Sequence, residues 1–415
     1  MQRRPEFSTE TDLRHDEESA PRPSSVPGLT ILSHPDFGRI GERCALPALT
    51  VGGTVRLSRQ EPLFHEPGRG LERPLGHRGL SRQPVLLRGL SHGGVRLEAG
   101  SSRTPLLLGG DGRPLEGRET LGSPALARGV ILRLGRHVLL LLHTLDCVGA
   151  HLPKGDLIGE SPEILELRAN ILKVADLETP VLIRGETGSG KELTARALHD
   201  ASGRARGPFV AVNMAAMPQE LAAAELFGST RGAFTGADRH RDGLFVQADG
   251  GTLFLDEIGE ATRAVQAMLL RTLETGEVRP VGGDRGRQVS VRIVSATDAR
   301  LEKEIAESRF RAPLLHRLAG YELHTPPLRS RREDLGRLLK HFLHQELASM
   351  GEAWRVENAG PREPWMSAEI IARLIGYDWP GNVRQLRNVI RQIVITSRGE
   401  EKARVPESVA ALLAG

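Results

Sequence analysis

The sequence predicts an α/β domain built on a parallel sheet with flanking helices, preceded by an all-β sandwich and followed by a small helical lid. Three observations support this prediction. Between residues 29 and 145, short apolar runs recur between glycine and proline turns. From 157 to 328, apolar runs alternate with helical patterns. From 329 to 398, the pattern is helical throughout.

The composition is that of a globular chain and excludes several classes of protein. With 415 residues, 26% charged and 39% apolar, the chain is long enough for two or three domains with proper cores. A net charge of +4 gives no general argument for nucleic-acid binding. Cys44 and Cys147 fit a reducing compartment and offer no metal cluster. No signal sequence opens the chain, and Val130–Leu145 is too short and too charged to cross a bilayer, so we expect a cytoplasmic protein.

The first part of the chain is expected to hold a leader and the sandwich. Residues 1–28 are polar, charged and aperiodic, and we expect them to be disordered. Strands of the sandwich, in residues 29–145, are expected within the apolar runs Ala48–Leu57, Val85–Leu87, Val95–Leu97, Pro105–Leu108, Val130–Leu134 and Val138–Leu142. Residues 146–156 then form a linker.

The α/β domain and the lid follow from similar patterns. A helix over Glu163–Ala175, with Ser161 as its N-cap, opens the α/β domain. Strands buried on both faces are expected at Val181–Arg184, Phe209–Val212, Thr252–Leu255 and Val291–Ala296. Lid helices are expected after Arg331, around Ala368–Ile375 and around Val383–Ser397, with a tail over 399–415.

A glycine-rich turn after the first of these strands has the form of a phosphate-binding loop. Its residues are Gly185, Glu186, Thr187, Gly188, Ser189, Gly190, Lys191 and Glu192. Glycines let backbone N–H groups turn toward a phosphate, the next helix adds its positive N-terminus, and Lys191 would reach the outer phosphates. Glu192 replaces the usual Ser or Thr, and a plain glycine turn before a helix is the alternative.

The strand Thr252–Leu255 ends in two acids that suit ATP hydrolysis. Asp256 would orient a magnesium ion, and Glu257 would polarise the attacking water. A solvated strand end often carries acids too. In the same sheet as a phosphate loop, however, the pair indicates an ATPase site.

Between these motifs lies a glycine-flanked loop with one aromatic residue and one threonine. Its central residues are Gly232, Ala233, Phe234, Thr235, Gly236 and Ala237. A mobile loop that acts on a partner has this composition, and so does a plain connection. Spacing alone does not decide between them.

Together, the motifs resemble the central domain of bacterial enhancer-binding proteins. The matching strings are GETGSGKE, ELFG followed by GAFTGA, ADGGTLFLDEIGE, LLRTLETGEVRPVGG, FRAPLLHRL and WPGNVRQLRNVI. They run from about Leu157 to Ile395 in the order of the family. Members of this family are AAA+ ATPases that use ATP and Mg²⁺, assemble as rings, usually hexamers, and activate transcription by the sigma-54 RNA polymerase holoenzyme.

The resemblance implies roles for residues around the nucleotide. Ile158 is expected to contact it, and Glu192 becomes a trait of the family. Asn213 matches the residue that hydrogen-bonds the catalytic glutamate and couples it to the partner loop. Arg384 matches the lid arginine that senses the γ-phosphate.

The resemblance also implies contacts between molecules. Arg311 and Arg317 match two arginines that are supplied to a neighbouring subunit's nucleotide, which would make activity depend on assembly. Phe234 and Thr235 match the loop residues that meet sigma-54.

Three features depart from the family pattern. Asp298 stands where Asn or His is usual, and an acid near the γ-phosphate is expected to reduce turnover. Pro313 stands in place of an acid between the two arginines and is expected to alter the subunit interface. No helix-turn-helix follows the lid, so the chain is either truncated or acts without binding an enhancer.

The order of segments in the N-terminal part resembles a forkhead-associated domain, a sandwich that binds phosphothreonine. The contact pattern of that family is Gly-Arg, then Ser-x-x-His, then Asn-Gly. Here Gly52-Gly53 stands near the first position, Ser81–Pro84 lacks the histidine, and Gly109-Gly110 replaces Asn-Gly. The remaining candidates for phosphopeptide contact are Ser81, Arg82 and Arg103. The alternative is a sandwich that serves partner contacts without binding phosphate.

These features predict an ATPase that remodels the closed sigma-54 promoter complex through the GAFTGA loop and is regulated by its N-terminal domain. A nucleotide-gated scaffold, or a partner in mixed rings, that binds sigma-54 but hydrolyses ATP poorly is the alternative, and Asp298 and Pro313 motivate it. A phosphothreonine reader with an incidental ATPase is a third hypothesis, against which the missing histidine argues.

Overall fold

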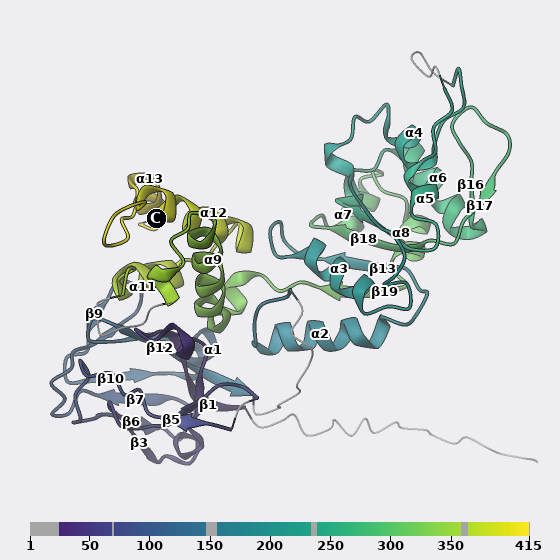
Figure 1. The fold of residues 1–415 in the computed structure, drawn as a ribbon. Helices are drawn as coiled ribbons and strands as arrows, with labels where there is room; N and C mark the ends of the chain where they lie inside the picture. Colours follow the sequence, from purple (N-terminus) through teal and green to yellow (C-terminus); the bar gives the residue numbers. More distant parts are fainter. Residues whose placement is uncertain (1–24, 69, 147–155, 234–238, 358–363, 415) are drawn as a thin grey trace, which may run out of the picture.

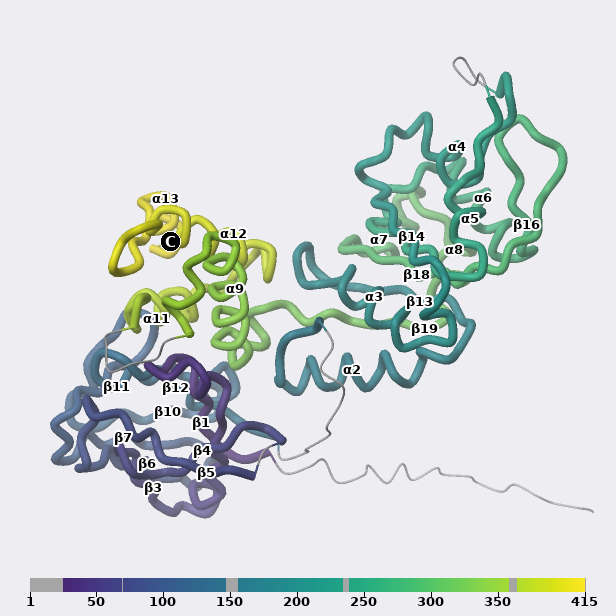
Figure 2. The backbone as a smooth tube through the Cα atoms, in the orientation of Figure 1, coloured from purple at the N-terminus to yellow at the C-terminus, as the bar shows by residue number. Residues whose placement is uncertain are grey.

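The computed structural model describes residues 25–68, 70–146, 156–233, 239–357 and 364–414, which form three units (Figure 1). A β-rich unit comes first, an α/β unit follows, and a helical lid ends the chain. Figure 2 traces the chain from the β-rich unit into the α/β unit and back to the lid, which lies on the β-rich unit. Within the described ranges, no helix is long and apolar enough to cross a membrane.

The N-terminal unit consists of two antiparallel sheets packed face to face. Eight strands form one sheet in the order β5-β4-β2-β1-β12-β11-β8-β9, and four form the other in the order β10-β7-β6-β3. The strands are β1 (Ser25–Ser33), β2 (Arg43–Ala45), β3 (Thr54–Leu57), β4 (Phe64–His65), β5 (Glu72–Arg73), β6 (Val85–Gly89), β7 (Val95–Glu98), β8 (Leu106–Leu108), β9 (Arg113–Pro114), β10 (Arg118–Leu121), β11 (Val130–Leu134) and β12 (Val138–Asp146). Helices η1 (Phe37–Arg39), η2 (Pro47–Val51) and α1 (Ser123–Arg128) lie between them.

Strand β12 is buried on both faces, which explains its unbroken run of leucines. Successive side chains of a strand point to opposite faces. Leu140 and Leu142 enter the core between the two sheets, whereas Leu139 and Leu141 join a second core that is otherwise built mostly by the lid. The run therefore connects the sandwich to a unit that the chain forms much later.

Two expected boundaries in this part are wrong. Strand β1 begins at Ser25, inside the expected leader, because Ser25 to Gly28 pair with the end of β12. For the same reason β12 extends to Asp146, where the linker was expected to start. Within the run Ala48–Leu57, strand β3 begins only after Gly52, whose left-handed φ of 76° ends η2.

The α/β unit has a five-stranded, all-parallel sheet in the order β14-β15-β18-β13-β19, which confirms the predicted fold class. Its strands are β13 (Val181–Arg184), β14 (Phe209–Asn213), β15 (Thr252–Asp256), β18 (Arg292–Thr297) and β19 (Tyr321–His324). The last of these was missed by the sequence patterns. A separate two-stranded hairpin is formed by β16 (Glu277–Val278) and β17 (Arg287–Gln288).

Helices cover both faces of the parallel sheet, as its apolar strands require. One face packs against α2 (Pro162–Val174) and α3 (Lys191–Asp200). The other packs against α4 (Ala222–Phe227), α5 (Leu244–Gln247), α6 (Arg263–Thr275) and α8 (Ala312–Leu318). Short helices η3 (Met214–Ala216), η4 (Ile258–Glu260) and α7 (Leu301–Ala306) follow the strand ends.

The lid is a bundle of helices joined to the sheet by two short 3-10 turns. The turns are η5 (Leu328–Ser330) and η6 (Arg332–Asp334), and the helices are α9 (Leu335–Ser349), α10 (Trp354–Glu357), α11 (Ala368–Gly376), α12 (Asn382–Thr396) and α13 (Glu407–Leu412). The expected tail over 399–415 is wrong in its middle, because α13 packs on the lid and buries Val409 in the lid core.

Candidate nucleotide site

The predicted site residues meet at the carboxyl edge of the parallel sheet. The phosphate loop follows β13, Asn213 ends β14, Asp256 ends β15, and Asp298 follows β18. The register pairs Asn213 with Asp256 and Arg184 with Thr297, so the four strand ends lie level with one another. Ligands of open α/β sheets bind at this edge.

Lys191 is the centre of the site. It is the first residue of α3, its side chain is only 6% exposed, and its Nζ donates to the Gly185 carbonyl at 3.0 Å and to Glu257 Oε1 at 3.2 Å. Helix α3 leaves its first N–H groups without helical partners, which suits a phosphate. Glu192, the next residue, is exposed.

Asp256 fits the role of holding a cation. Its Oδ1 is buried and, among the described residues, has no hydrogen-bond partner, which is a costly state for an acceptor. Mg²⁺ prefers carboxylate oxygens and water as ligands, together with nucleotide phosphates. Asp256, through its unpartnered Oδ1, would hold such an ion together with the phosphates of the nucleotide.

Asn213 contacts a different acid from the one that the resemblance implied. Its Nδ2 donates to Asp256 Oδ2 at 3.1 Å, and its Oδ1 accepts from the backbone N–H groups of Ala215 and Ala216, which begins η3. The expected bond to Glu257 is therefore replaced by a bond to its neighbour. The parallel register explains this, because it sets Asn213 beside Asp256.

Glu257 combines an unusual backbone with a perturbed carboxyl. Its φ of 52° and ψ of 49° are left-handed, which turns the chain sharply after β15. Burial raises the pKa of Glu257, Lys191 opposes that shift, and the charge of Asp298 adds to it. A carboxyl with a raised pKa, close to a phosphate loop, suits a general base.

Asp298 lies within the site, as its place in the sequence implied. Its Oδ2 accepts from Thr187 Oγ1 at 2.5 Å, and its backbone N–H lies 3.4 Å from Glu257 Oε2. Asp298 thus contacts both the phosphate loop and Glu257. A second acid beside Glu257 raises the cost of bringing phosphates close.

The lid rests directly on the phosphate loop. Gly188 has a left-handed φ of 75°, and a Cβ there would lie 2.5 Å from the Gly381 carbonyl, so only glycine fits. Its carbonyl accepts from the Val383 N–H at 3.0 Å, and Asn382 Nδ2 donates to the Thr187 carbonyl at 3.1 Å. These contacts place the exposed Arg384 at the phosphate loop.

Two further arginines of the lid hold the loop, and the sequence patterns missed both. Arg329 binds Glu186 with two bonds of 2.7 and 2.5 Å, and together with Asn382 it lowers the pKa of Glu186 to about 2. The buried Arg331 donates to the Ser189 carbonyl at 3.4 Å. Arg329, Arg331 and Arg332 lie close together in a polar turn of the sequence. This cluster of positive charge was the signal that could have indicated a contact with the phosphate loop.

Arg311 immediately precedes helix α8, and Arg317 lies on it. Arg311 is the residue before its first turn and is held by a backbone bond to the buried Gln266, while Arg317 is exposed and pairs loosely with Glu274 at 3.9 Å. The Nε of Arg311 is buried without a partner among the described residues. Pro313 is exposed in the first turn of the same helix, where proline is well tolerated.

The GAFTGA loop is described only at its base. Phe234, Thr235, Gly236 and Ala237 lie outside the described residues, whereas Gly232 and Ala233 lie inside them. At the base, Ser229 and Arg241 exchange two backbone bonds of 3.0 Å, and the Thr230 N–H donates to the Val281 carbonyl at 3.0 Å. The base of the loop therefore lies against Val281, in the connection between β16 (Glu277–Val278) and β17 (Arg287–Gln288).

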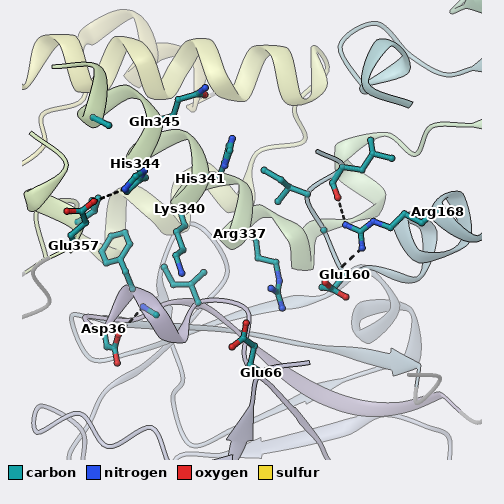
Figure 3. A pocket seen from close by; sticks show the side chains of 18 residues that line it. Asp36, Glu66, Glu160, Arg168, Arg337, Lys340, His341, His344, Gln345 and Glu357 are labelled. Atoms are coloured by element: carbon teal, nitrogen blue, oxygen red, sulfur yellow. Dashed lines mark hydrogen bonds and ion pairs between the residues drawn. The ribbon is translucent and has the colours of Figure 1, made fainter. Parts of the chain in front are cut away.

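A cavity of about 870 Å³ lies where the three units meet (Figure 3). Ile158 and Gly159 line it from the α/β unit, Arg337 and Lys340 from α9, and Phe37 from η1. No phosphate-loop residue lines it. The cavity thus contains one predicted nucleotide residue, Ile158, but is separate from the phosphate site.

The three phosphopeptide candidates lie on adjoining loops at one end of the sandwich. The Ser81 N–H donates to Thr104 Oγ1 at 2.6 Å, next to Arg103, and the Arg59 N–H donates to the Ser81 carbonyl at 3.0 Å. Arg82 and Arg103 are exposed. Arg59 was missed, although an arginine in the turn just after β3 was a readable signal.

The two glycine pairs lie away from these loops, contrary to the family pattern. Gly52-Gly53 precedes β3, whereas Arg59 follows it, so the two are at opposite ends of that strand. Gly109-Gly110 follows β8, at the end facing the lid, and a Cβ on Gly110 would lie 3.1 Å from the Ala372 carbonyl. Gly110 therefore serves packing against α11.

The geometry defines a nucleotide-binding domain of the phosphate-loop class, with two acids after the neighbouring strand and a helical lid on the loop. Residues 157–324 match the family described as the Sigma-54 interaction domain, and residues 329–408 match the AAA+ ATPase lid domain. The chain therefore carries a Sigma-54 interaction domain followed by an AAA+ ATPase lid domain, as the sequence motifs predicted.

Curated relatives are similar to more than half of the chain. The chain is 46% identical over 249 residues to the DNA-binding transcriptional regulator NtrC of Escherichia coli, covering 60% of this chain and 51% of the relative. It is 45% identical over 249 residues to the regulatory protein LuxO of Vibrio cholerae, covering 60% and 45%. It is 43% identical over 303 residues to the anaerobic nitric oxide reductase transcription regulator NorR of Vibrio vulnificus, covering 71% and 56%. The chain thus spans about half the length of the curated relatives it matches.

Solved structures show the same domain with nucleotides bound. The structure of NtrX from Brucella abortus in complex with ATP is 36% identical, with a TM-score of 0.55, and covers 62% of this chain and 55% of that one. Its complex with ADP gives 36% identity and a TM-score of 0.55, covering 61% and 55%.

Proposed function

We propose that this protein is a cytoplasmic, ring-forming ATPase that activates the sigma-54 RNA polymerase holoenzyme by remodelling its closed promoter complex. One observation carries the proposal. Lys191, Asp256 and Glu257 converge at the carboxyl edge of one parallel sheet, beneath a lid that grips the phosphate loop. The relatives named above, which are transcription regulators, support the choice of partner.

Hydrolysis relies on positioning and on charge. Lys191 neutralises the outer phosphates of ATP, and the amides of the loop hold them in place. Mg²⁺, held by Asp256 and the phosphates, would stabilise negative charge that develops on them. Glu257 polarises the attacking water, a role that its raised pKa favours. Arg384 comes from the lid of the same subunit, and Arg311 and Arg317 from a neighbour.

The phosphate state then acts on the partner loop. Asn213 bonds to Asp256 and begins η3, and η3 contacts η4, which follows Glu257. A change at the γ-phosphate is therefore passed to elements that precede the GAFTGA loop. Phe234 and Thr235 would meet sigma-54 there.

ATP turnover per protomer, measured against protein concentration, tests the proposal. Specific activity is expected to rise with concentration, and both Glu257→Gln and Arg311→Ala are expected to lower kcat by about 10³-fold or more. Mixing the two inactive variants should restore part of the activity, because each supplies what the other lacks. Arg309→Ala is the matched control, since this exposed arginine lies two residues away and pairs within its own chain.

A hydrolysis-poor scaffold is the second candidate, and the contacts of Asp298 favour it. If the wild type matches Glu257→Gln at every concentration while ATP still binds, the scaffold replaces the ATPase. The mixing experiment would then show no recovery.

For the sandwich, we propose phosphothreonine recognition by Ser81, Arg82 and Arg103. The convergence of their loops supports this, although the family histidine is absent. Fluorescence anisotropy of a phosphothreonine peptide with the full chain tests it. Equal affinity for the unphosphorylated peptide, or no effect of the double change Arg82→Ala and Arg103→Ala, would leave a sandwich that serves protein contacts only.

A further inference from the structure

The sandwich is packed on the lid through a continuous apolar core. Leu32, Ile131, Leu139 and Leu141 of the sandwich share this core with residues of α9, α11 and α12. The contact is close, because a Cβ on Gly336 of α9 would lie 2.7 Å from the Leu32 carbonyl. In Figure 1 the lid sits directly on β1 and β12, while the parallel sheet lies apart. The sandwich and lid are thus set to move together.

One sandwich residue also reaches the α/β unit. Arg43, on β2, donates through Nη2 to Glu333 Oε2 at 2.7 Å and to the Glu160 carbonyl at 2.7 Å. Glu333 belongs to the lid, and Glu160 immediately precedes α2. The Arg43 guanidinium, 14% exposed, therefore joins all three units.

The lid also binds the residues at the start of α2, through Asp334. Asp334, fully buried, accepts from the Glu160 N–H at 2.6 Å and from Ser161 Oγ at 2.6 Å. The backbone of Glu160 thus bonds to both units: its N–H donates to Asp334 of the lid, and its carbonyl accepts from Arg43 of the sandwich. Ile158, an expected nucleotide contact, lies two residues earlier.

Burial makes Arg43 important for the state of Glu333. The side chain of Glu333 is 7% exposed, and burial raises its pKa to about 8, a shift that Arg43 opposes. His143 Nε2 lies 3.8 Å away and is itself bonded to Thr30, and burial lowers its pKa to about 3. Because that imidazole stays neutral, Arg43 is the cation that contacts Glu333 among the described residues.

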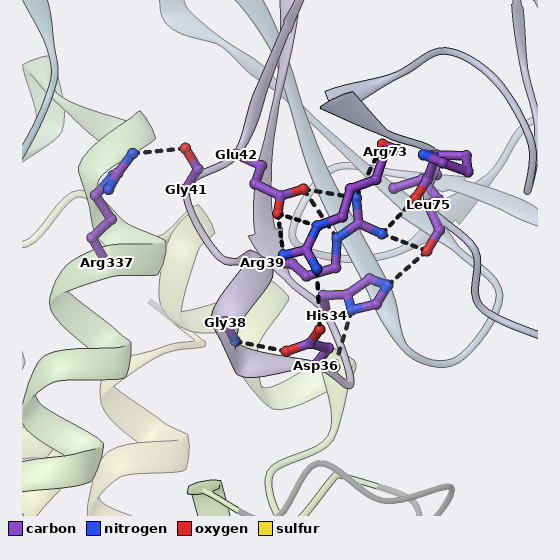
Figure 4. Close-up of polar contacts among 10 residues, drawn as sticks. His34, Asp36, Gly38, Arg39, Gly41, Glu42, Arg73, Leu75 and Arg337 are labelled. Carbon is purple, nitrogen blue, oxygen red and sulfur yellow. Dashed lines mark hydrogen bonds and ion pairs between the residues drawn. The ribbon is translucent and has the colours of Figure 1, made fainter. Parts of the chain in front are cut away.

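Arg43 is held in place by its own unit. Its neighbour Glu42 is buried and receives bonds from Arg39 at 2.7 Å and from Arg73 at 2.6 Å (Figure 4). The adjacent Gly41 carbonyl accepts from Arg337 of α9 at 2.7 Å. These contacts of Glu42 and Gly41 therefore hold strand β2, which carries Arg43, in a fixed position.

The lid segment that Arg43 holds leads straight to the phosphates. Within residues 328–334, Arg329 binds Glu186, Arg331 binds the Ser189 carbonyl, and Asp334 binds Glu160. The cavity in Figure 3 borders this junction, so one side of the junction is not closely packed. Polar contacts of Asp334 connect the lid to the start of α2 at this point, next to the partly buried Ile158, which packs against the lid core.

We propose that Arg43 is a positioning residue for the nucleotide site, through which the sandwich sets the angle between the lid and the α/β unit. The arginine acts through Glu333 and Glu160, and hence on the lid turn that grips the phosphate loop. The effect on turnover rests on the proposed ATPase function, whereas the effect on ATP binding does not.

The test measures ATP affinity in the full chain, in a Glu257→Gln background that separates binding from hydrolysis. Arg43→Met is expected to raise the Kd for Mg-ATP about tenfold, because fewer molecules hold the binding-competent lid angle. In the otherwise wild-type chain, the same change should raise KM similarly and leave kcat at saturating ATP within about twofold, since bound ATP selects that angle. A lysine at position 43 satisfies one acceptor at a time, so Arg43→Lys should fall between.

A matched control and a double variant separate positioning from folding. Arg56→Met removes another sandwich arginine that pairs with a glutamate, on strand β3 of the other sheet, and should leave Kd unchanged. The pair Arg43→Met with Glu333→Met removes both buried charges and should restore folding. Its Kd should stay raised, because the Glu160 carbonyl is still released. The proposal would be overturned by an unchanged Kd for Mg-ATP in Arg43→Met, or by a return of that Kd to the wild-type value in the double variant. A chain that binds ATP as expected but never hydrolyses it would overturn only the ATPase function.

Discussion

At the scale of single residues, the site depends on how acids are placed around Lys191. Glu257 is the proposed base, Asp256 has a buried oxygen suited to a cation, and Asp298 bonds to Thr187 of the phosphate loop. Three carboxyl groups so close together repel one another, and they repel phosphate even more. The charge of Asp298 is the one that the proposed chemistry does not need.

We therefore expect Asp298→Asn to increase turnover. Removing the charge takes away one of the effects that raise the pKa of Glu257, so the base stays ionised to lower pH. The acid limb of the kcat profile should therefore move to lower pH, and the gain in kcat should be largest below the old limb, where Glu257 of the wild type is protonated.

The measurement is a pH profile of kcat at saturating ATP. Asp200→Asn, an exposed acid at the end of α3, is the control and should leave the profile in place. If Asp298→Asn moves the limb upward or lowers kcat across the range, Asp298 assists the reaction instead.

At the scale of elements, close approach between backbones determines which helices can meet which strands. Helix α9 crosses β1 at Gly336, and α11 meets the turn after β8 at Gly110. Glycine in a helix interior costs up to about 1 kcal/mol relative to alanine. Its presence in α9 is explained by the strand backbone that lies against it.

Gly336→Ala should therefore destabilise the protein even though alanine favours helix. A Cβ would lie 2.9 Å from Leu32 Cα, so the sandwich must shift away from the lid, at a cost of about 1–3 kcal/mol in the free energy of unfolding. Urea unfolding followed by circular dichroism measures it. Gly203→Ala is the control, because nothing lies near its Cβ position, and it should stay within about 0.5 kcal/mol of wild type. A more stable Gly336→Ala would mean that helix propensity outweighs the contact.

At the scale of the whole molecule, the cores do not follow the order of the chain. One apolar core combines strands before residue 146 with helices after residue 334, whereas the parallel sheet has its own two cores. Units that share a core should unfold together. The polar junction around Glu160 is then the weaker connection.

Leu139→Ala, a change in the sandwich, should destabilise the lid. The chain has three tryptophans, at positions 354, 365 and 379, all in the lid, so their fluorescence reports lid unfolding. Loss of a buried leucine should lower the unfolding free energy of that transition by about 2–5 kcal/mol. Leu182→Ala, in the core of the parallel sheet, is the comparison and should act mainly on a transition that fluorescence does not follow. An unmoved tryptophan transition in Leu139→Ala would show that sandwich and lid unfold independently.

The sequence by itself determined the parallel sheet, its phosphate loop, the two acids and the helical lid. Each of these depends on local spacing: a glycine turn between strand and helix, acids at a strand end, and a helical stripe. Only the tertiary structure decided that Asn213 bonds to Asp256, that Arg329 and Arg331 grip the phosphate loop, and that the second face of β12 is covered by the lid. These contacts join residues that are far apart in the chain, and a leucine run indicates that both faces of a strand are buried without indicating which distant segment covers the second face. Long-range packing and register therefore settled what local patterns left open.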